Sequence, residues 1–226
     1  RDVERSRGLG DVYKRQIAQR MILRSFKICL AMAGTKLIVD GQENIPEDGA
    51  VLYVGNHSSY YDILCSYVAT ERGMGFFAKK EMEKVPLLST WMKRLHCLFL
   101  DRNDLKQGLK TILTAIEKVK SGISICIFPE GTRNKNEDEL DMLPFHEGSF
   151  KIAAKANCPI IPMAISGSAD IWENHFPRVK KTHVILEYGT PIYIDQLEKE
   201  DKKHLGAYTQ NIICLLYTSP SPRDLS

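Results

Sequence analysis

Apolar runs that favour β-strands alternate along this chain with segments of helical periodicity, and this alternation constrains the fold more than any other feature. The strand-like runs, rich in valine, isoleucine and phenylalanine, are residues 50–55, 74–79, 96–101, 123–128, 159–166 and 183–189. The helical segments are residues 62–72, 83–95, 104–122 and 148–157. Such alternation is typical of proteins whose strands lie largely parallel in a buried sheet. We therefore predict an α/β fold: a single domain with a largely parallel central sheet flanked by helices.

The clearest of the helical segments is residues 104–122. An apolar stripe recurs there every three or four residues, and Gly122 supplies a stop signal. The stripe consists of Leu105, Leu109, Ile112, Ile116 and Val119. This pattern predicts an amphipathic helix with one apolar face.

The two ends of the chain differ from the rest in the DNA that could encode them. Residues 6–16 and residues 214–223 can be encoded by the two opposite strands of a single short DNA element. Two unrelated protein termini should not share one element, so this relation indicates sequencing-adapter read-through. We therefore divide the chain into adapter-derived residues 1–16, an N-terminal amphipathic helix at 17–36, a folded domain at 37–213 and adapter-derived residues 214–226.

Without those ends the charge is nearly balanced. The 31 basic residues of the full chain lose six and the 28 acidic residues lose four, which leaves 25 basic and 24 acidic residues. This balance gives no sign of the basic surface that binds nucleic acid. No nucleic-acid partner is therefore predicted.

The cysteines indicate a reducing environment. Cys29, Cys65, Cys97, Cys126 and Cys158 lie mostly in apolar runs, without the paired spacing of a zinc site. We interpret them as reduced core residues in a cytosolic setting, and we expect no metal and no cofactor. No apolar run approaches the roughly 20 residues that span a bilayer, and no signal peptide is visible.

The N-terminal helix has two interpretations. Arg20, Arg24 and Lys27 recur at spacings of four and three, so they share one helical face. Met21, Ile22, Phe26, Cys29 and Leu30 supply much of an apolar side. The helix either packs on its own domain as an ordinary surface helix, or it lies in a membrane interface with its cations toward anionic headgroups.

Polar clusters follow three of the predicted strands. His57 follows the first, Asp101 and Arg102 follow the third, and residues 129–133 follow the fourth. In open α/β sheets, ligands bind beyond the carboxyl ends of the strands. Three clusters at that edge predict a functional site there.

The first cluster, "NHSSYYD", places Asp62 five residues after His57 across a strand-to-helix turn. One of the serines can cap the helix, and Asp62 can hydrogen-bond one imidazole nitrogen of His57. The other nitrogen is then left as an acceptor, which makes a competent general base near neutral pH. The alternative is a histidine with a purely structural partner, because acids are common in the first turn of a helix.

The cluster "FPEGTRN" indicates an anion site. Gly131 lets the backbone approach a ligand closely, and Arg133 offers a planar guanidinium to a phosphate. Thr132 adds a hydroxyl donor, Glu130 adds an acceptor, and Arg102 could reach the same anion. The spacing matches neither a P-loop nor a dinucleotide-binding turn, so nucleotide binding has little support. The alternative is a polar loop with an exposed arginine.

In this order, "NHSSYYD", "FLDR", "FPEGTR" and "IIPMAIS" resemble the four motif blocks of the glycerolipid acyltransferase family, and most closely its 1-acyl-glycerol-3-phosphate acyltransferases. The resemblance covers roughly residues 41–191, within an acyltransferase domain at 37–213. His96 departs from the pattern, because the second block usually has glycine at that place.

The resemblance implies an activity and a role for each motif residue. A fatty acyl group would move from acyl-CoA or acyl carrier protein to the free hydroxyl of lysophosphatidic acid, giving phosphatidic acid. His57 would be the catalytic base and Asp62 its partner. The phosphorylated glycerol would be bound by Arg102, Glu130, Gly131, Thr132 and Arg133.

A lipid acceptor also changes the interpretation of the N-terminal helix. A lysophospholipid must be drawn from a bilayer, so membrane contact is now favoured, with the enzyme on the cytoplasmic face. The expected partners are the lysophospholipid, the acyl donor and the membrane surface. The alternatives are an acyltransferase for glycerol 3-phosphate or another lysolipid, a catalytically silent lipid-binding protein, and a hydrolase.

Overall fold

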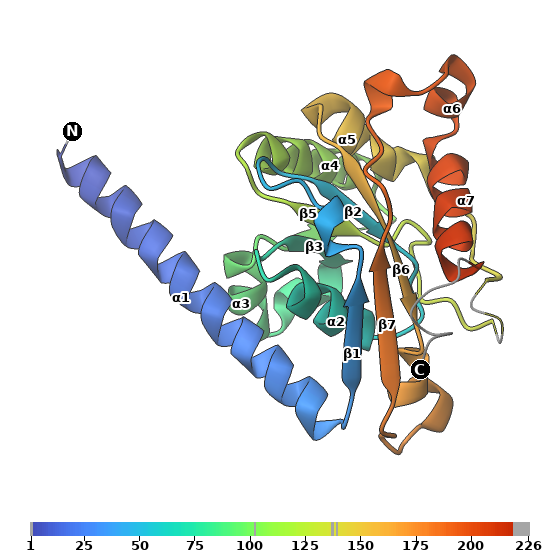
Figure 1. Ribbon diagram of the computed structural model, residues 1–226. Helices are drawn as coiled ribbons and strands as arrows, with labels where there is room; N and C mark the ends of the chain where they lie inside the picture. Colours follow the sequence, from blue (N-terminus) through green and yellow to red (C-terminus); the bar gives the residue numbers. More distant parts are fainter. Residues whose placement is uncertain (1, 102, 137, 139, 219–226) are drawn as a thin grey trace.

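The computed structural model describes residues 2–218, apart from 102, 137 and 139, with side chains from residue 16 onward. Seven strands form one sheet, in the order β1-β7-β6-β2-β5-β3-β4 (Figure 1). They are β1 (Lys36–Asp40), β2 (Leu52–Gly55), β3 (Gly75–Lys79), β4 (Leu98–Leu100), β5 (Ile125–Ile127), β6 (Ile160–Ser166) and β7 (His183–Tyr188). All neighbouring strands are parallel except the antiparallel pair β6–β7. The predicted fold class is therefore confirmed.

Helices cover both faces of the sheet (Figure 1). One layer contains α1 (Asp2–Met32), α2 (Tyr61–Thr70) and α3 (Leu88–Arg94), and the other contains α4 (Leu105–Lys120), α5 (Lys151–Ala156) and α7 (Leu205–Thr218), with the short α6 (Lys199–Lys203) before α7. Successive residues of a strand point to opposite faces. In β2, Tyr53 therefore packs in the core under α1 and α2, whereas Leu52 and Val54 pack in the core under α4 and α5.

The predicted strands and the four predicted helices of the domain are all present, with shorter bounds, and β1, α6 and α7 were not predicted. The N-terminal helix, predicted at 17–36, is α1, which begins at Asp2 and ends at Met32. The apolar stripe predicted for α4 is split. Ile116 and Val119 are buried, but Leu105 is 89% exposed and Leu109 is 60% exposed. The prediction of a single apolar face is wrong for those two leucines.

One face of α1 packs on the domain, against α2 and α3. Ile22 and Leu30 are buried there, and the ring of Phe26 meets the ring of Tyr67 edge-on at 5.4 Å. Lys27 forms an ion pair with Glu71, with 3.1 Å between Nζ and the carboxylate. Part of the predicted apolar side thus stabilises the contact between α1 and its own domain.

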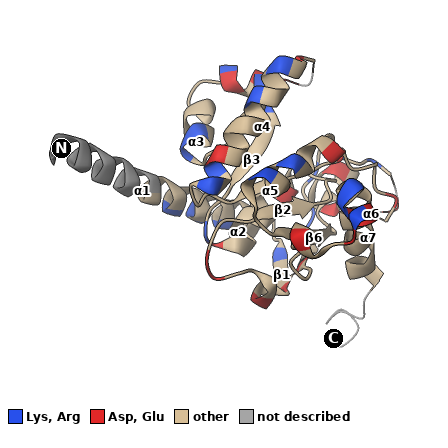
Figure 2. Ribbon diagram, turned by 90° about the horizontal axis from the view of Figure 1, so that it is seen from above, with Lys and Arg blue, Asp and Glu red and all other residues tan. Residues whose placement is uncertain are grey.

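A second face of α1 is exposed and carries both apolar and basic residues. The exposed apolar side chains are Ile17, Met21, Ile28 and Met32. Arg20 and Arg24 are exposed beside them, and basic residues recur along the described part of α1 (Figure 2). No helix among the described residues is long and apolar enough to span a membrane.

Both terminal helices continue past the points where we place the ends of the native sequence. α1 includes residues before Ile17, and α7 extends beyond Ile213 to Thr218. The conformation of a segment does not bear on its coding origin, so this division of the chain stays a prediction.

His96, which stands where the family usually has glycine, has left-handed backbone geometry. Its φ is +61°, and its side chain is largely buried. The turn also lies tight against β3, because a Cβ added at Gly75 would meet the carbonyl oxygen of His96 at 2.5 Å. The turn that glycine favours is therefore kept, with a histidine in it.

This geometry predicts that glycine is more stable than alanine at position 96, the reverse of their usual order within a helix. Because the left-handed conformation costs an L-residue roughly 1–2 kcal/mol, His96→Gly should be more stable than His96→Ala by about 1 kcal/mol. The control is Thr114, a half-buried residue within α4, where the alanine variant should be the more stable one. Urea unfolding of the four variants measures this, and alanine exceeding glycine at both positions would contradict it.

Candidate active site

Three parallel neighbours, β2, β5 and β6, end at the same edge of the sheet and supply the site. His57 follows β2, Glu130 and Arg133 follow β5, and Ser168 follows β6. A cavity of about 960 Å³ opens at this edge, and the side chains that line it include His57, Glu130, Arg133 and Glu173. The polar clusters after β2 and β5 therefore meet, as the sequence predicts.

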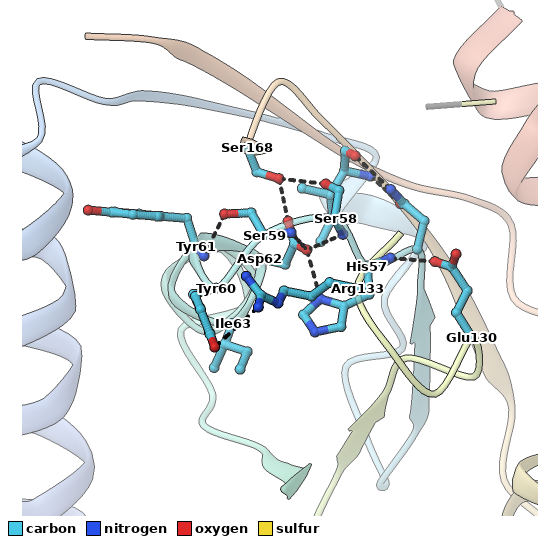
Figure 3. Close-up of polar contacts among 12 residues, drawn as sticks. His57, Ser58, Ser59, Tyr60, Tyr61, Asp62, Ile63, Glu130, Arg133 and Ser168 are labelled. Carbon is cyan, nitrogen blue, oxygen red and sulfur yellow. Dashed lines mark hydrogen bonds and ion pairs between the residues drawn. The ribbon is translucent and has the colours of Figure 1, made fainter. Parts of the chain in front are cut away.

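His57 and Asp62 form the predicted pair. Nδ1 of His57 lies 2.9 Å from Oδ2 of Asp62, and the second imidazole nitrogen points away from the carboxylate (Figure 3). The imidazole stacks on the ring of Phe128, with 4.4 Å between centroids, and is only 16% exposed. The ring is thus fixed on two sides, with its remaining edge at the cavity.

Asp62 lies in the first turn of α2 and is fully buried. Besides the imidazole, its carboxylate accepts the backbone N–H groups of Ser58 and Ser59, each at 2.8 Å, and the hydroxyl of Ser168 at 2.5 Å (Figure 3). These donors replace the water that a buried carboxylate has lost. Burial raises the pKa of the nearby Cys65 thiol, and the carboxylate of Asp62 raises it further.

Glu130 fixes the backbone of His57. Its carboxylate accepts the backbone N–H of His57 at 2.6 Å and that of Leu143 at 3.0 Å. Burial raises the pKa of Glu130, although these two donors act in the opposite direction. A further bond runs from the backbone N–H of Asn134 to the carbonyl of His57, at 2.6 Å. The loop after β5 and the loop after β2 are thus joined beside the imidazole.

Gly131 is required by the shape of this loop. Its φ of +74° lies in the left-handed region, and a Cβ there would meet the ring of His146 at 3.1 Å. Both constraints favour glycine.

Arg133 is held by two partners at the mouth of the cavity. Its guanidinium lies over the ring of Tyr60, with 3.8 Å from Cζ to the centroid, and Nη2 donates to the tyrosine hydroxyl at 3.2 Å. Nη1 donates to the carboxylate of Glu173, also at 3.2 Å. The Arg133 side chain is 29% exposed and lines the cavity, so a ligand there can reach it.

Two other predicted site residues, Thr132 and Arg102, are not placed in the cavity by the structure. Thr132 is exposed and is not among the side chains that line the cavity. Arg102 lies outside the described residues, and its neighbour Asp101 forms an ion pair with Lys80 at 3.1 Å. Among the described residues, no three histidine, cysteine or acidic side chains gather as a metal site would require.

Sequence reasoning missed the contribution of the segment after β6. Ser168 reaches Asp62, Glu173 reaches Arg133, and Trp172 lies beside Tyr60, with 6.2 Å between their rings. The signal was available, since these residues follow a predicted strand at the same edge of the sheet. Only the clusters after β2, β4 and β5 were singled out.

Comparison with known proteins identifies the family. The family model described as Acyltransferase matches residues 36–166. The chain belongs to this acyltransferase family. A probable 1-acyl-sn-glycerol-3-phosphate acyltransferase of Mycoplasma pneumoniae is 31% identical to this acyltransferase over 186 residues, which are 80% of this chain and 68% of the relative. The 1-acyl-sn-glycerol-3-phosphate acyltransferase of Saccharomyces cerevisiae is 30% identical over 201 residues, which are 88% of this chain and 65% of the relative.

The fold of this chain also matches a solved structure of an acyltransferase of the same kind as these relatives. The crystal structure of the 1-acyl-sn-glycerophosphate acyltransferase of Thermotoga maritima matches this acyltransferase with a TM-score of 0.74 and 26% identity, over 92% of this chain and 82% of that one. The family resemblance drawn from the motifs is confirmed.

The hydrogen bonds to Asp62 predict unequal effects of removing two buried serine hydroxyls. Ser168 donates to the carboxylate, whereas Ser66 donates to the backbone carbonyl of the same residue. Because hydrogen bonds to charged groups contribute more, Ser168→Ala should lower the free energy of unfolding by about 1.5–3 kcal/mol, against about 0.5–1.5 kcal/mol for Ser66→Ala. Urea unfolding compares the two. Equal losses would mean that the carboxylate does not depend on Ser168.

Proposed function

We propose that this acyltransferase moves a fatty acyl group from acyl-CoA or acyl carrier protein to the free hydroxyl of lysophosphatidic acid, giving phosphatidic acid. The observation that carries the proposal is the His57–Asp62 pair, whose second imidazole nitrogen borders the cavity that Arg133 also lines. A base and a cation in one cavity suit an acceptor that bears both a hydroxyl and a phosphate. The names of the relatives support the same acceptor.

His57 is proposed as the general base. An acyl thioester is already activated, so the difficult step is to make a weakly acidic hydroxyl nucleophilic. The second imidazole nitrogen takes the hydroxyl proton while the hydroxyl oxygen bonds to the thioester carbonyl carbon. When the tetrahedral intermediate collapses, the carbon–sulfur bond breaks and the departing thiolate receives that proton from the imidazolium. A positioned base of this kind typically contributes about 10²–10⁴ in rate.

Asp62 is proposed to fix the imidazole rather than to react. A hydrogen bond from Nδ1 to Asp62 selects the tautomer in which the other nitrogen is an acceptor. The same bond favours the imidazolium that forms during the reaction. The proposed reaction uses no metal and no cofactor, since the acyl donor is a co-substrate.

Arg133 is proposed to hold the phosphate of the acceptor. A guanidinium can grip phosphate through two parallel hydrogen bonds, which orients the glycerol as well as attracting it. The motif resemblance also assigns Arg102, Glu130, Gly131 and Thr132 to acceptor binding. Glu130 and Gly131 would contribute by shaping the loop that carries Arg133, since Glu130 bonds the backbone of His57 and Gly131 sits in a left-handed turn.

Substitution of His57 tests the mechanism. His57→Ala should remove nearly all transfer, and Asp62→Asn should cost less, because it disturbs orientation without removing the base. His204→Ala, which removes an exposed histidine of the α6–α7 region, is the matched control and should keep wild-type turnover. Release of CoA thiol is measured with lysophosphatidic acid, glycerol 3-phosphate, other lysolipids and no acceptor.

The outcomes of that panel separate the alternatives. Near-wild-type turnover by purified His57→Ala would contradict the mechanism. Faster transfer to glycerol 3-phosphate or to another lysolipid would reassign the acceptor. Thiol release that is independent of any acceptor would indicate a hydrolase, and no release at all would indicate a silent lipid-binding protein.

We also propose that the exposed face of α1 contacts the cytoplasmic surface of a membrane. Met21 and Ile28, 50% and 58% exposed, provide an apolar surface, and Arg20 and Arg24 are exposed beside it. This combination suits a helix lying in the interface of an anionic bilayer. Lys27 contributes less to this face than its spacing predicts, because Glu71 neutralises it.

Charge reversal on α1 tests membrane contact. Each cation near an anionic surface contributes about 1 kcal/mol, so Arg20/Arg24→Glu should weaken vesicle binding about 30-fold or more. Lys151/Lys155→Glu is the control, because it makes the same charge change at the same spacing on α5, where both residues are exposed. Sedimentation with anionic vesicles measures both. Equal losses would mean that net charge, and not α1, determines binding.

A further inference from the structure

The segment from Ser168 to Phe176, which follows β6, crosses the site and contacts the turn that carries the catalytic pair. It contains two short 3₁₀ turns, Ala169–Ile171 and Glu173–His175. Ser168 bonds the carboxylate of Asp62 and the hydroxyl of Ser58. The resemblance to the family's motif blocks assigns no role to the residues beyond "IIPMAIS", so the contacts of Glu173 are a separate observation.

Glu173 joins the proposed phosphate-binding arginine to the turn before α2. One carboxylate oxygen accepts the backbone N–H of Tyr60 at 2.8 Å and Nη1 of Arg133 at 3.2 Å. The other accepts the hydroxyl of Ser59 at 2.7 Å. The side chain is only 16% exposed, and its bonds to Ser59 and Arg133 are partly shielded from water, which strengthens them. Glu173 is therefore held by Ser59 and Tyr60 and in turn holds Arg133.

The contacts of Arg133 leave most of its donors for a ligand. A guanidinium has five N–H groups. Glu173 and the hydroxyl of Tyr60 receive bonds from one nitrogen each, and the ring of Tyr60 supports the guanidinium plane. An arginine held in this way reaches the cavity in a single orientation, because its long side chain has lost the freedom to swing.

We propose that Glu173 is a positioning residue that orients Arg133 toward the phosphate of the acceptor and fixes it relative to His57. This inference rests on the proposed function of Arg133. The turn formed by residues 58–60 would then position both ends of the acceptor. Its residues 58 and 59 bind Asp62, which orients the base, and its residues 59 and 60 bind Glu173, which orients the arginine.

If Glu173 instead competed with the phosphate for Arg133, its substitution would have the opposite effect on activity. If the carboxylate of Glu173 only occupied the place of the phosphate, its removal would free Arg133 and improve the use of the acceptor. The number of its bonds argues for a positioning role, because a carboxylate displaced by phosphate would leave the N–H of Tyr60 and the hydroxyl of Ser59 without their partner.

Glu173→Gln tests the proposal, since glutamine keeps the size of the side chain and loses its charge. We expect kcat/KM for lysophosphatidic acid to fall about tenfold or more, because a misaligned hydroxyl meets the base poorly, while KM for the acyl donor changes less than about twofold. A phosphate-free acceptor, a monoacylglycerol, should lose less than about twofold. Glu200→Gln, which removes a glutamate paired with Lys203 at 3.1 Å on α6, is the matched control and should behave as wild type.

The Arg133→Lys background shows whether Glu173 acts through Arg133. Lysine keeps the charge and loses the planar donor array, so adding Glu173→Gln to it should cost less than about twofold more. Three results would overturn the proposal: an improved kcat/KM for lysophosphatidic acid, an equal fall for both acceptors, or a full additional fall in the lysine background. If Glu173→Gln fails to fold, Glu173→Asp gives the same readouts with the charge kept and the carboxylate withdrawn.

Failure of the proposed function would look different. If the wild-type protein transfers no acyl group to lysophosphatidic acid, the assignment of acceptor fails without reference to Glu173. Calorimetric binding of glycerol 3-phosphate then decides the role of Glu173. Weaker binding by Glu173→Gln than by Glu200→Gln supports positioning of Arg133, and unchanged or tighter binding overturns it.

Discussion

A fully buried carboxylate, that of Asp62, is the constraint on which the rest of the site depends. A charge out of water is tolerated only where hydrogen-bond donors replace the solvent. Asp62 obtains them from the ring of His57, from the backbone at Ser58 and Ser59, and from Ser168 at the end of β6. Solvation of one charge therefore fixes the imidazole and also joins two segments that are far apart in the sequence.

Glu130 links His57 to the loop after β5, as Asp62 links it to the segment after β6. Its carboxylate accepts the backbone N–H of His57 from the loop after β5, so His57 is connected to the ends of both strands that flank β2. These links are short because the three strands are parallel neighbours whose carboxyl ends meet at one edge. The fixed position of His57 thus follows from strand order, and not from the motif around His57 alone.

The sequence was sufficient for features that depend on local pattern and insufficient for those that depend on long-range contacts. Strand and helix patterns predicted the sheet, and the spacing of His57 and Asp62 predicted their contact, because a turn of five residues leaves few alternatives. Periodicity alone did not reveal that Leu105 is exposed, since a stripe of apolar residues does not state which part of it meets the sheet. Glu173 was missed because its partners lie 40 and more than 100 residues away.

The turn before α2 has a consequence for how this protein can bind an anion. A helix N-terminus often serves that purpose, because its first N–H groups lack partners within the helix. Here the N–H groups of the turn before α2 and of the first helical residue are already used: Asp62 receives those of Ser58 and Ser59, Glu173 receives that of Tyr60, and the hydroxyl of Ser59 receives that of Tyr61. Two carboxylates of the protein thus accept backbone N–H groups that could otherwise bind an anion. The anionic acceptor proposed here would therefore have to be bound by side chains, so the proposed function depends on how the guanidinium of Arg133 is oriented.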